Sequence, residues 1–233
     1  MSKYFIEATG YQRVVLLSAL AVASALLTHF APNDPWQIMR VPGLYDKDGS
    51  APILPGLYFG SVLAVGAYAW KKNNLFSAGV ILVGTTVAWV VAYEFAFHLV
   101  TTYQKVYLDE LCTSISGPLF EEIKKYRDLV QNPFELPKCF SDKLANIMHL
   151  LAGIASGLTG GIITLIGISL VTPEFRTIND WSRTLFVASL TGALLANNTN
   201  LLLLFIVWQV SVAASIAFGW SVQETLKVGR EFQ

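Results

Sequence analysis

The chain has 233 residues, of which 54% are hydrophobic and 14% are charged, and its formal net charge is zero. Soluble globular domains carry about 25% charged residues, so this composition argues against a soluble domain and indicates contact with lipid. We therefore expect the lipid bilayer as a partner. The chain has no basic face, so we expect no nucleic-acid partner.

Six apolar segments follow one another along the chain, and most are long enough to cross a bilayer. A hydrocarbon core of about 30 Å needs roughly 20 helical residues at 1.5 Å each. The segments cover residues 14–31, 53–70, 75–100, 147–171, 183–196 and 201–220. The sequence therefore predicts an all-α integral membrane protein. We expect a bundle of about six transmembrane helices, forming one polytopic domain over residues 1–233.

Lysine and arginine are unevenly distributed over the connections, which predicts how the bundle is oriented. With the N-terminus in the cytoplasm, the tails and short connections place eight basic residues inward and only Arg40 and Lys47 outward. The long connection 101–146 adds six basic residues outside, but long loops weigh less in this rule. Trp70, Trp181 and Trp220 then fall at the inner ends of their segments, where indole rings favour the headgroup region. We therefore expect both termini in the cytoplasm. The short connections, without a clear targeting signal, favour a bacterial inner membrane.

The fifth segment is the shortest, because residues 183–196 make only about 21 Å of helix. Neighbouring residues must extend it if it is to span. Asn197 and Asn198 begin a turn that would close a helical hairpin, since asparagine competes for backbone hydrogen bonds and tolerates a left-handed turn. The alternative is a re-entrant helix pair whose asparagine side chains line a polar cavity. That alternative leaves five full spans and an outer C-terminus.

The longest connection, residues 101–146, is predicted to be an outer loop, periplasmic or extracellular. It contains Cys112 and Cys139, the only two cysteines in the chain. In an oxidising compartment they would form a structural disulfide that closes a loop of roughly 28 residues and stabilises it by about 3 kcal/mol. Apolar residues at helical spacing in residues 118–130 predict a short amphipathic helix on the outer surface.

Ionisable side chains near the predicted outer boundary are the first candidates for chemistry. Glu94 is a carboxylate inside an apolar segment, which is costly unless the group is paired, protonated or open to water. It precedes His98 by one helical turn on the same face. His29 and His149 fall at a similar predicted depth, so three histidines with Glu94 form an alternative metal site. Interfacial side chains that reach headgroup water are the simplest interpretation, and no other cofactor is predicted.

Polar residues elsewhere add to the transport candidates. Gln209 lies near the middle of the last apolar segment, where it needs a partner across the bundle or a polar path. We group it with Glu94, His98, Asn197 and Asn198. Ordinary hydrogen bonding between helices is the alternative interpretation of Gln209.

Small residues at four-residue spacing indicate faces where helices approach closely. The two stripes consist of Gly153, Gly157 and Gly161 in the fourth segment, and of Gly56, Gly60 and Ala64 in the second. This spacing predicts helix packing within the chain. A seam between copies of the chain, or with a partner in a membrane complex, is the alternative.

Three functions are compatible with these features. The leading hypothesis is a small transporter or channel, which requires Glu94, His98 and Gln209 to converge inside the bundle. The second is a non-catalytic accessory or assembly subunit of a larger membrane complex. The third is a membrane-embedded metal or redox enzyme that uses the outer histidines and cysteines. No nucleotide, zinc-protease, hydrolase or dinucleotide motif occurs, and no catalytic residue is predicted.

Overall fold

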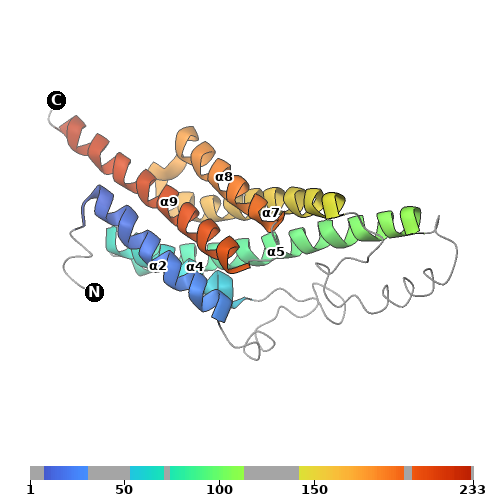
Figure 1. Ribbon diagram of the computed structural model, residues 1–233. Coiled ribbons are helices and arrows are strands. Elements are labelled where there is room, and N and C mark those ends of the chain that lie inside the picture. The colour runs from blue at the N-terminus through green and yellow to red at the C-terminus, as the bar shows by residue number, and fades with distance from the viewer. Residues whose placement is uncertain (1–7, 31–52, 71–73, 113–141, 197–200, 232–233) are drawn as a thin grey trace.

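The computed structural model of the protein describes residues 8–30, 53–70, 74–112, 142–196 and 201–231 (Figure 1). These residues form helices and short connections, without a strand among them. The α-helices are α2 (Gly10–Phe30), α4 (Leu54–Trp70), α5 (Leu75–Cys112), α7 (Asp142–Val171), α8 (Ile178–Gly192) and α9 (Leu201–Glu231). Two short 3₁₀ helices, η1 (Pro173–Arg176) and η2 (Ala193–Ala196), flank α8. The predicted all-α fold is confirmed for the described residues.

Four of these helices contain stretches long and apolar enough to cross a membrane. The stretches are Gly10–Phe30, Leu75–Val100, Ile147–Val171 and Leu202–Val222. The apolar helix α4 has 17 residues, or about 25 Å of helical rise, and is shorter than these. The structure therefore fits a membrane protein with four long apolar helices, and a count of six spans goes beyond this result.

The predicted outer loop is shorter than the sequence suggested, because helices enter it from both sides. α5 continues to Cys112 and α7 begins at Asp142. The predicted amphipathic helix at residues 118–130 lies outside the described residues, as does Cys139. The Cys112–Cys139 disulfide therefore stays a prediction.

The fifth helix begins earlier than its apolar pattern suggested. α8 starts at Ile178, and η2 extends it, so that the two together rise about 30 Å. Thr177 caps the first turn, where its Oγ1 accepts a hydrogen bond from the Asp180 backbone N–H at 3.2 Å. Asn197 and Asn198 lie outside the described residues, so the structure does not choose between the hairpin and the re-entrant turn.

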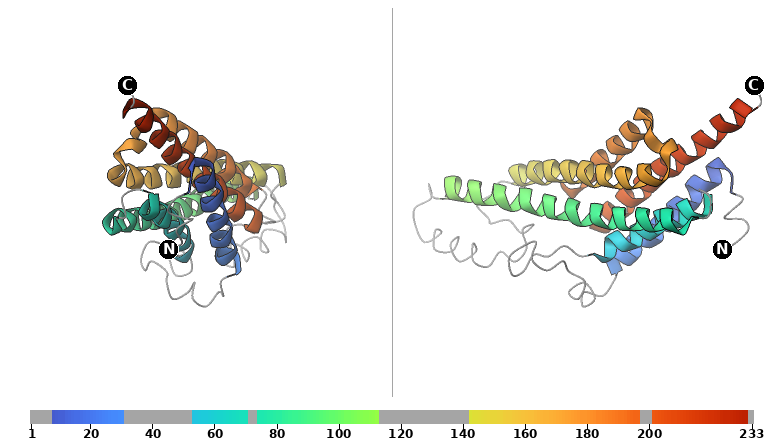
Figure 2. Two further views of the ribbon diagram at one scale, coloured as in Figure 1. Left: turned by 90° about the vertical axis from the view of Figure 1, so that its left-hand side faces the viewer. Right: turned by 180° about the vertical axis from the view of Figure 1, so that it is seen from behind.

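The six helices form a closed ring in chain order. Each helix packs against the next one along the chain, and α9 returns to pack against α2. Figures 1 and 2 show α2, α8 and α9 crossing α4, α5 and α7 at an angle. Aromatic side chains from three helices meet inside the ring. The Trp208 ring lies 5.4 Å from that of Phe59 and 6.2 Å from that of Trp89, which is 5.9 Å from the ring of Phe205.

Glycines lie where neighbouring helices approach most closely. A Cβ atom at Gly60 of α4 would stand 2.9 Å from the Leu82 carbonyl oxygen of α5. On α7, a Cβ atom at Gly157 would overlap the Ala188 carbonyl oxygen of α8. Gly56 makes a similar approach to α5, and Gly161 faces Leu185 and Ala188. A Cβ atom at Gly192 would overlap the carbonyl oxygen of Gly153. These glycine faces are therefore occupied by contacts within the chain.

We predict that Gly157→Ala destabilises the bundle by about 1–3 kcal/mol, because its methyl group forces the α8 backbone away from α7. Gly79→Ala is the matched control, since a Cβ atom at Gly79 meets nothing within 4 Å. The variants are purified in a mild detergent and unfolded by adding increasing amounts of a denaturing detergent. The midpoint of each unfolding curve measures the difference in stability. Equal midpoints for the two variants would show that the α7–α8 contact is not a tight one.

Candidate functional site

Glu94 and His98 lie on the face of α5 that points away from the ring. They share a helical stripe with Val83 and Val87, which are 61% and 47% exposed. Along this stripe the Glu94 side chain is partly exposed, although its Oε2 atom is buried, and His98 is exposed. The packed faces of α5 are elsewhere, with Leu82, Thr86 and Trp89 against α4 and Gly84, Ala88 and Ala92 against α7. The stripe is therefore the face of α5 that these two neighbours leave uncovered.

The histidines do not form one group with Glu94. His149 is buried on α7, whereas His29 is exposed at the end of α2, with its ring 4.8 Å from that of Phe30. Gly160 of α7 lies against Ala92 of α5, and the two helices run antiparallel. From this contact, helical rise places Glu94 about 3 Å along α5 and His149 about 16 Å in the same direction along α7, so the two residues are about 13 Å apart along the helix axes. Among the residues that the structure describes, no three histidine, cysteine, aspartate or glutamate side chains are placed to hold a metal ion.

Gln209 lies in the core, at the interface of α9 with α2. It is completely buried, and its Nε2 donates a hydrogen bond of 3.4 Å to the Thr28 Oγ1. The neighbouring Trp208 is level with Trp89 on α5. Glu94 lies about 7 Å farther along α5 by helical rise and on its outward stripe. The structure therefore places Gln209 and the Glu94–His98 pair in different parts of the protein.

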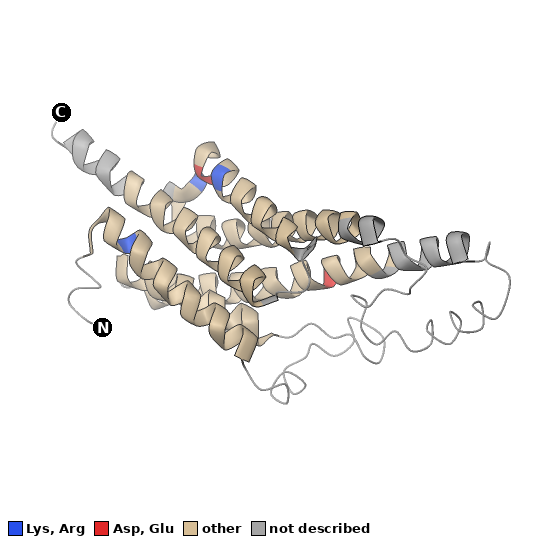
Figure 3. Ribbon diagram, in the orientation of Figure 1, with Lys and Arg blue, Asp and Glu red and all other residues tan. Residues whose placement is uncertain are grey.

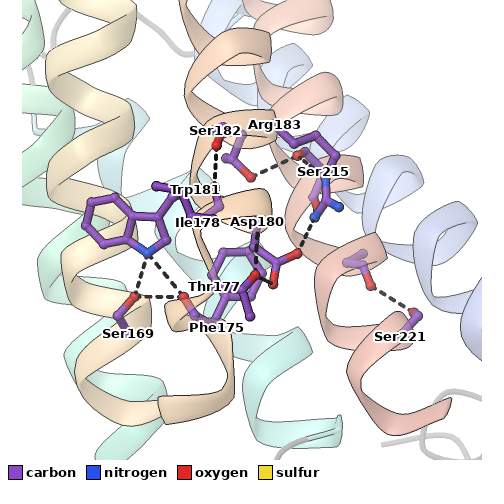
Figure 4. Close-up of polar contacts among 12 residues, drawn as sticks. Ser169, Phe175, Thr177, Ile178, Asp180, Trp181, Ser182, Arg183, Ser215 and Ser221 are labelled. Carbon is purple, nitrogen blue, oxygen red and sulfur yellow. Dashed lines mark hydrogen bonds and ion pairs between the residues drawn. The ribbon is translucent and has the colours of Figure 1, made fainter. Parts of the chain in front are cut away.

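A polar cluster that was not predicted from the sequence joins α8 to α9 (Figure 4). The Arg183 Nη2 donates to the Asp180 Oδ1 at 2.9 Å and to the Ser215 carbonyl oxygen at 3.1 Å. The Arg183 Nε also donates to the Ser215 Oγ, which lies 2.9 Å from the Thr184 Oγ1. We call Asp180, Arg183, Thr184 and Ser215 the α8–α9 polar cluster.

The chain reaches this cluster through a turn that satisfies its own polar groups. The Trp181 Nε1 donates to the Phe175 carbonyl oxygen at 3.1 Å and to the Ser169 Oγ at 3.2 Å, and the Ser169 Oγ donates to the same carbonyl at 3.0 Å. The Arg176 Nε donates to the Ser169 carbonyl oxygen. Gly219 of α9 allows the close approach, since a Cβ atom there would overlap Phe175 and stand 2.9 Å from the Arg183 Nη2.

Charge matching gives the cluster a structural role. The Asp180 side chain is only 8% exposed, so its carboxylate needs the guanidinium beside it, whereas the Arg183 side chain is 32% exposed. The Thr-x-x-Asp pattern at 177–180 is a capping signal that could have revealed the start of α8. The apolar pattern alone placed the start at 183, which left Asp180 in a connection.

The cluster belongs to an end of the bundle rich in arginine and tryptophan. The Arg13 guanidinium lies 5.5 Å from the Trp70 ring, and the rings of Trp70 and Trp220 are 6.4 Å apart. The Ser221 Oγ donates to the Gly10 carbonyl oxygen, which brings α2 and α9 together here. Figure 3 shows that most described charged residues gather at this end. We call it the arginine end.

Comparisons with known proteins add no functional assignment: no protein-family model matches the chain, and no curated protein and no solved structure is significantly similar to it.

We predict that Arg183→Met destabilises the protein by about 1–3 kcal/mol, because it leaves the Asp180 carboxylate buried without a cation. Asp180→Asn in the same chain should recover part of the loss, since the uncompensated charge is then gone. The stability of Arg183→Lys should lie between those of the unmodified protein and Arg183→Met, because an ammonium group keeps the charge but lacks the forked geometry of the guanidinium. Denaturing-detergent unfolding of the four proteins measures these effects. A double variant no more stable than Arg183→Met would contradict the charge-pair account.

Proposed function

We propose that this protein is a non-catalytic accessory or assembly subunit that binds another membrane protein through the outward stripe of α5. The observation that supports this function is the position of Glu94 on the stripe that also carries Val83, Val87 and His98. Carboxylate and imidazole groups at membrane depth are expensive to place, and they hydrogen-bond well across helix interfaces. A partner helix with a donor side chain at this depth is the chemistry that the stripe would recognise.

The geometry of α5 and α7 supports a partner-binding role. With 38 residues, α5 is about 57 Å long, well beyond a hydrocarbon core of about 30 Å. Figures 1 and 2 show α5 and α7 projecting together past the ends of α2 and α4. The glycine faces, for which a seam between chains was the alternative prediction, are occupied by contacts within the chain, so we place the partner on α5.

We predict that a photoreactive residue at Val87, with Glu94 retained, crosslinks to one specific protein in the native membrane. The same residue at Phe186, which is 67% exposed on α8, serves as the control and should label lipid. Glu94→Ala should reduce the crosslink at Val87 several-fold, because a hydrogen-bonding group at the interface is lost. Immunoblots of the crosslinked membranes measure both results. If the photoreactive residue at Val87 labelled only lipid, as the control at Phe186 should, the accessory function would be overturned.

We further propose six spans, with the arginine end facing the cytoplasm of a bacterial inner membrane. Gly10 lies beside Ser221 at that end, which is compatible with an even number of crossings between them. Arg13, Arg176 and Arg183 at this end agree with the excess of basic residues expected on the cytoplasmic side.

We predict that alkaline phosphatase fused after Gln233 is inactive in bacteria, whereas green fluorescent protein fused there is fluorescent, because a cytoplasmic C-terminus suits only the second reporter. Expression levels measured by immunoblot control for unstable fusions. Active phosphatase would instead support five spans and the re-entrant turn at Asn197 and Asn198.

Transport is the second candidate function, and the buried Gln209 is the observation that favours it. A polar side chain in the middle of the last helix is compatible with a polar path, although its described contact is to Thr28 of the adjacent α2. Glu94 and His98 do not converge on Gln209, and the aromatic side chains of Phe59, Trp89 and Trp208 meet inside the ring. The accessory function therefore becomes the leading proposal.

A further inference from the structure

The interface of α2 and α9 contains polar atoms deep inside the bundle. Gln209 is completely buried, and Ser24 and Thr28 are each 3% exposed. At 3.4 Å, the hydrogen bond from the Gln209 Nε2 to the Thr28 Oγ1 is long. Among the described residues, neither the Gln209 Oε1 nor the Ser24 Oγ has a hydrogen-bond partner.

The register of the two helices brings these unpartnered atoms near each other. α2 and α9 run antiparallel, with Gly10 beside Ser221 at one end and Thr28 beside Gln209 farther along. Ser24 comes one turn before Thr28, and Ala213 comes one turn after Gln209. Counted from the contact of Gly10 with Ser221, Ser24 lies about 21 Å along α2 and Gln209 about 18 Å along α9, so the two residues are nearly level. The methyl group of Ala213 can neither donate a hydrogen bond to them nor accept one.

One helical turn of about 5.4 Å is close to the span of two consecutive hydrogen bonds through a single water molecule. Such a water could accept from the Ser24 hydroxyl, donate to the Gln209 Oε1 and bond to Thr28. Buried waters in proteins make about three hydrogen bonds to groups that would otherwise be unsatisfied.

We propose that α2 and α9 hold a bound water molecule that bridges Ser24, Thr28 and Gln209. The flanking residues Ala21, Ala25 and Ala213 are small and uncharged, so a neutral ligand of about this size suits the site and an ion would lack a countercharge. This site is separate from the partner-binding stripe of α5. It explains why a completely buried glutamine can keep its amide oxygen away from protein donors.

Nuclear magnetic resonance of the full chain in lipid nanodiscs tests the proposal, with ¹⁵N-labelled glutamine side chains. Loss of one signal in Gln209→Met identifies the Gln209 amide protons. We expect a cross peak between these protons and water. It should persist in Thr159→Val, a control that removes a hydroxyl already bonded to the Ala155 carbonyl oxygen of its own helix.

The bridging geometry is tested by Ser24→Ala, which should abolish or strongly weaken the cross peak. A signal relayed through the Thr28 hydroxyl would survive that change and would overturn the bridge. Ala213→Val is a second variant, because its larger side chain should fill the site and displace the water. Absence of any cross peak from water to the Gln209 amide in the unmodified protein would show that the interface is dry.

Discussion

Close approach of helix backbones at small residues is the constraint on which this structure depends. In lipid, helices gain little from hiding apolar side chains from each other, so van der Waals packing must hold them together. α7 achieves this on two faces, with Gly157 against α8, and Gly160 and Gly167 against α5. The approach of α7 and α8 also sets where the turn between them lies. The position of that turn brings Arg183 within reach of Ser215 on α9.

Helix positions could be predicted from the sequence because hydrocarbon imposes a length and a composition on whatever crosses it. α4 begins within one residue of its predicted apolar segment and ends at the same residue, and α5 begins at the first residue of its own segment. The prediction failed where polar residues continue a helix. Thr177 and Asp180 extend α8 backward through a capping hydrogen bond, and α5 runs on into a polar segment as far as Cys112. Apolar periodicity cannot detect a helix that is stabilised by a cap.

The candidate site shows a different limit of sequence analysis. Glu94 and His98 share a helix face by simple periodicity, yet the sequence does not say whether that face points inward. The glycine and alanine contacts of α5 with α7 decide the direction, and they arise from residues far apart in the chain. Gln209 could be identified as a residue in need of a partner, but its position against Thr28 depends on how α9 packs on α2. The pairing of Arg183 with Asp180, three residues earlier on α8, was missed because the apolar pattern started this helix at 183. The contact of Arg183 with Ser215 on α9 depends on how the two helices pack.

Closure of the ring between the first and the last of these helices has a consequence for biosynthesis. The ribosome makes α2 first, and its packing partner α9 is made last, after the whole bundle between them. Until α9 enters the membrane, the hydroxyl-bearing face of α2 with Ser24 and Thr28 has no partner helix, and Trp70 of α4 lacks the ring of Trp220. The early helices must therefore tolerate lipid or an insertion factor on surfaces that are buried in the finished protein. Serine and threonine suit this interval, because their hydroxyl groups can bond to the carbonyl oxygens of their own helix in the meantime.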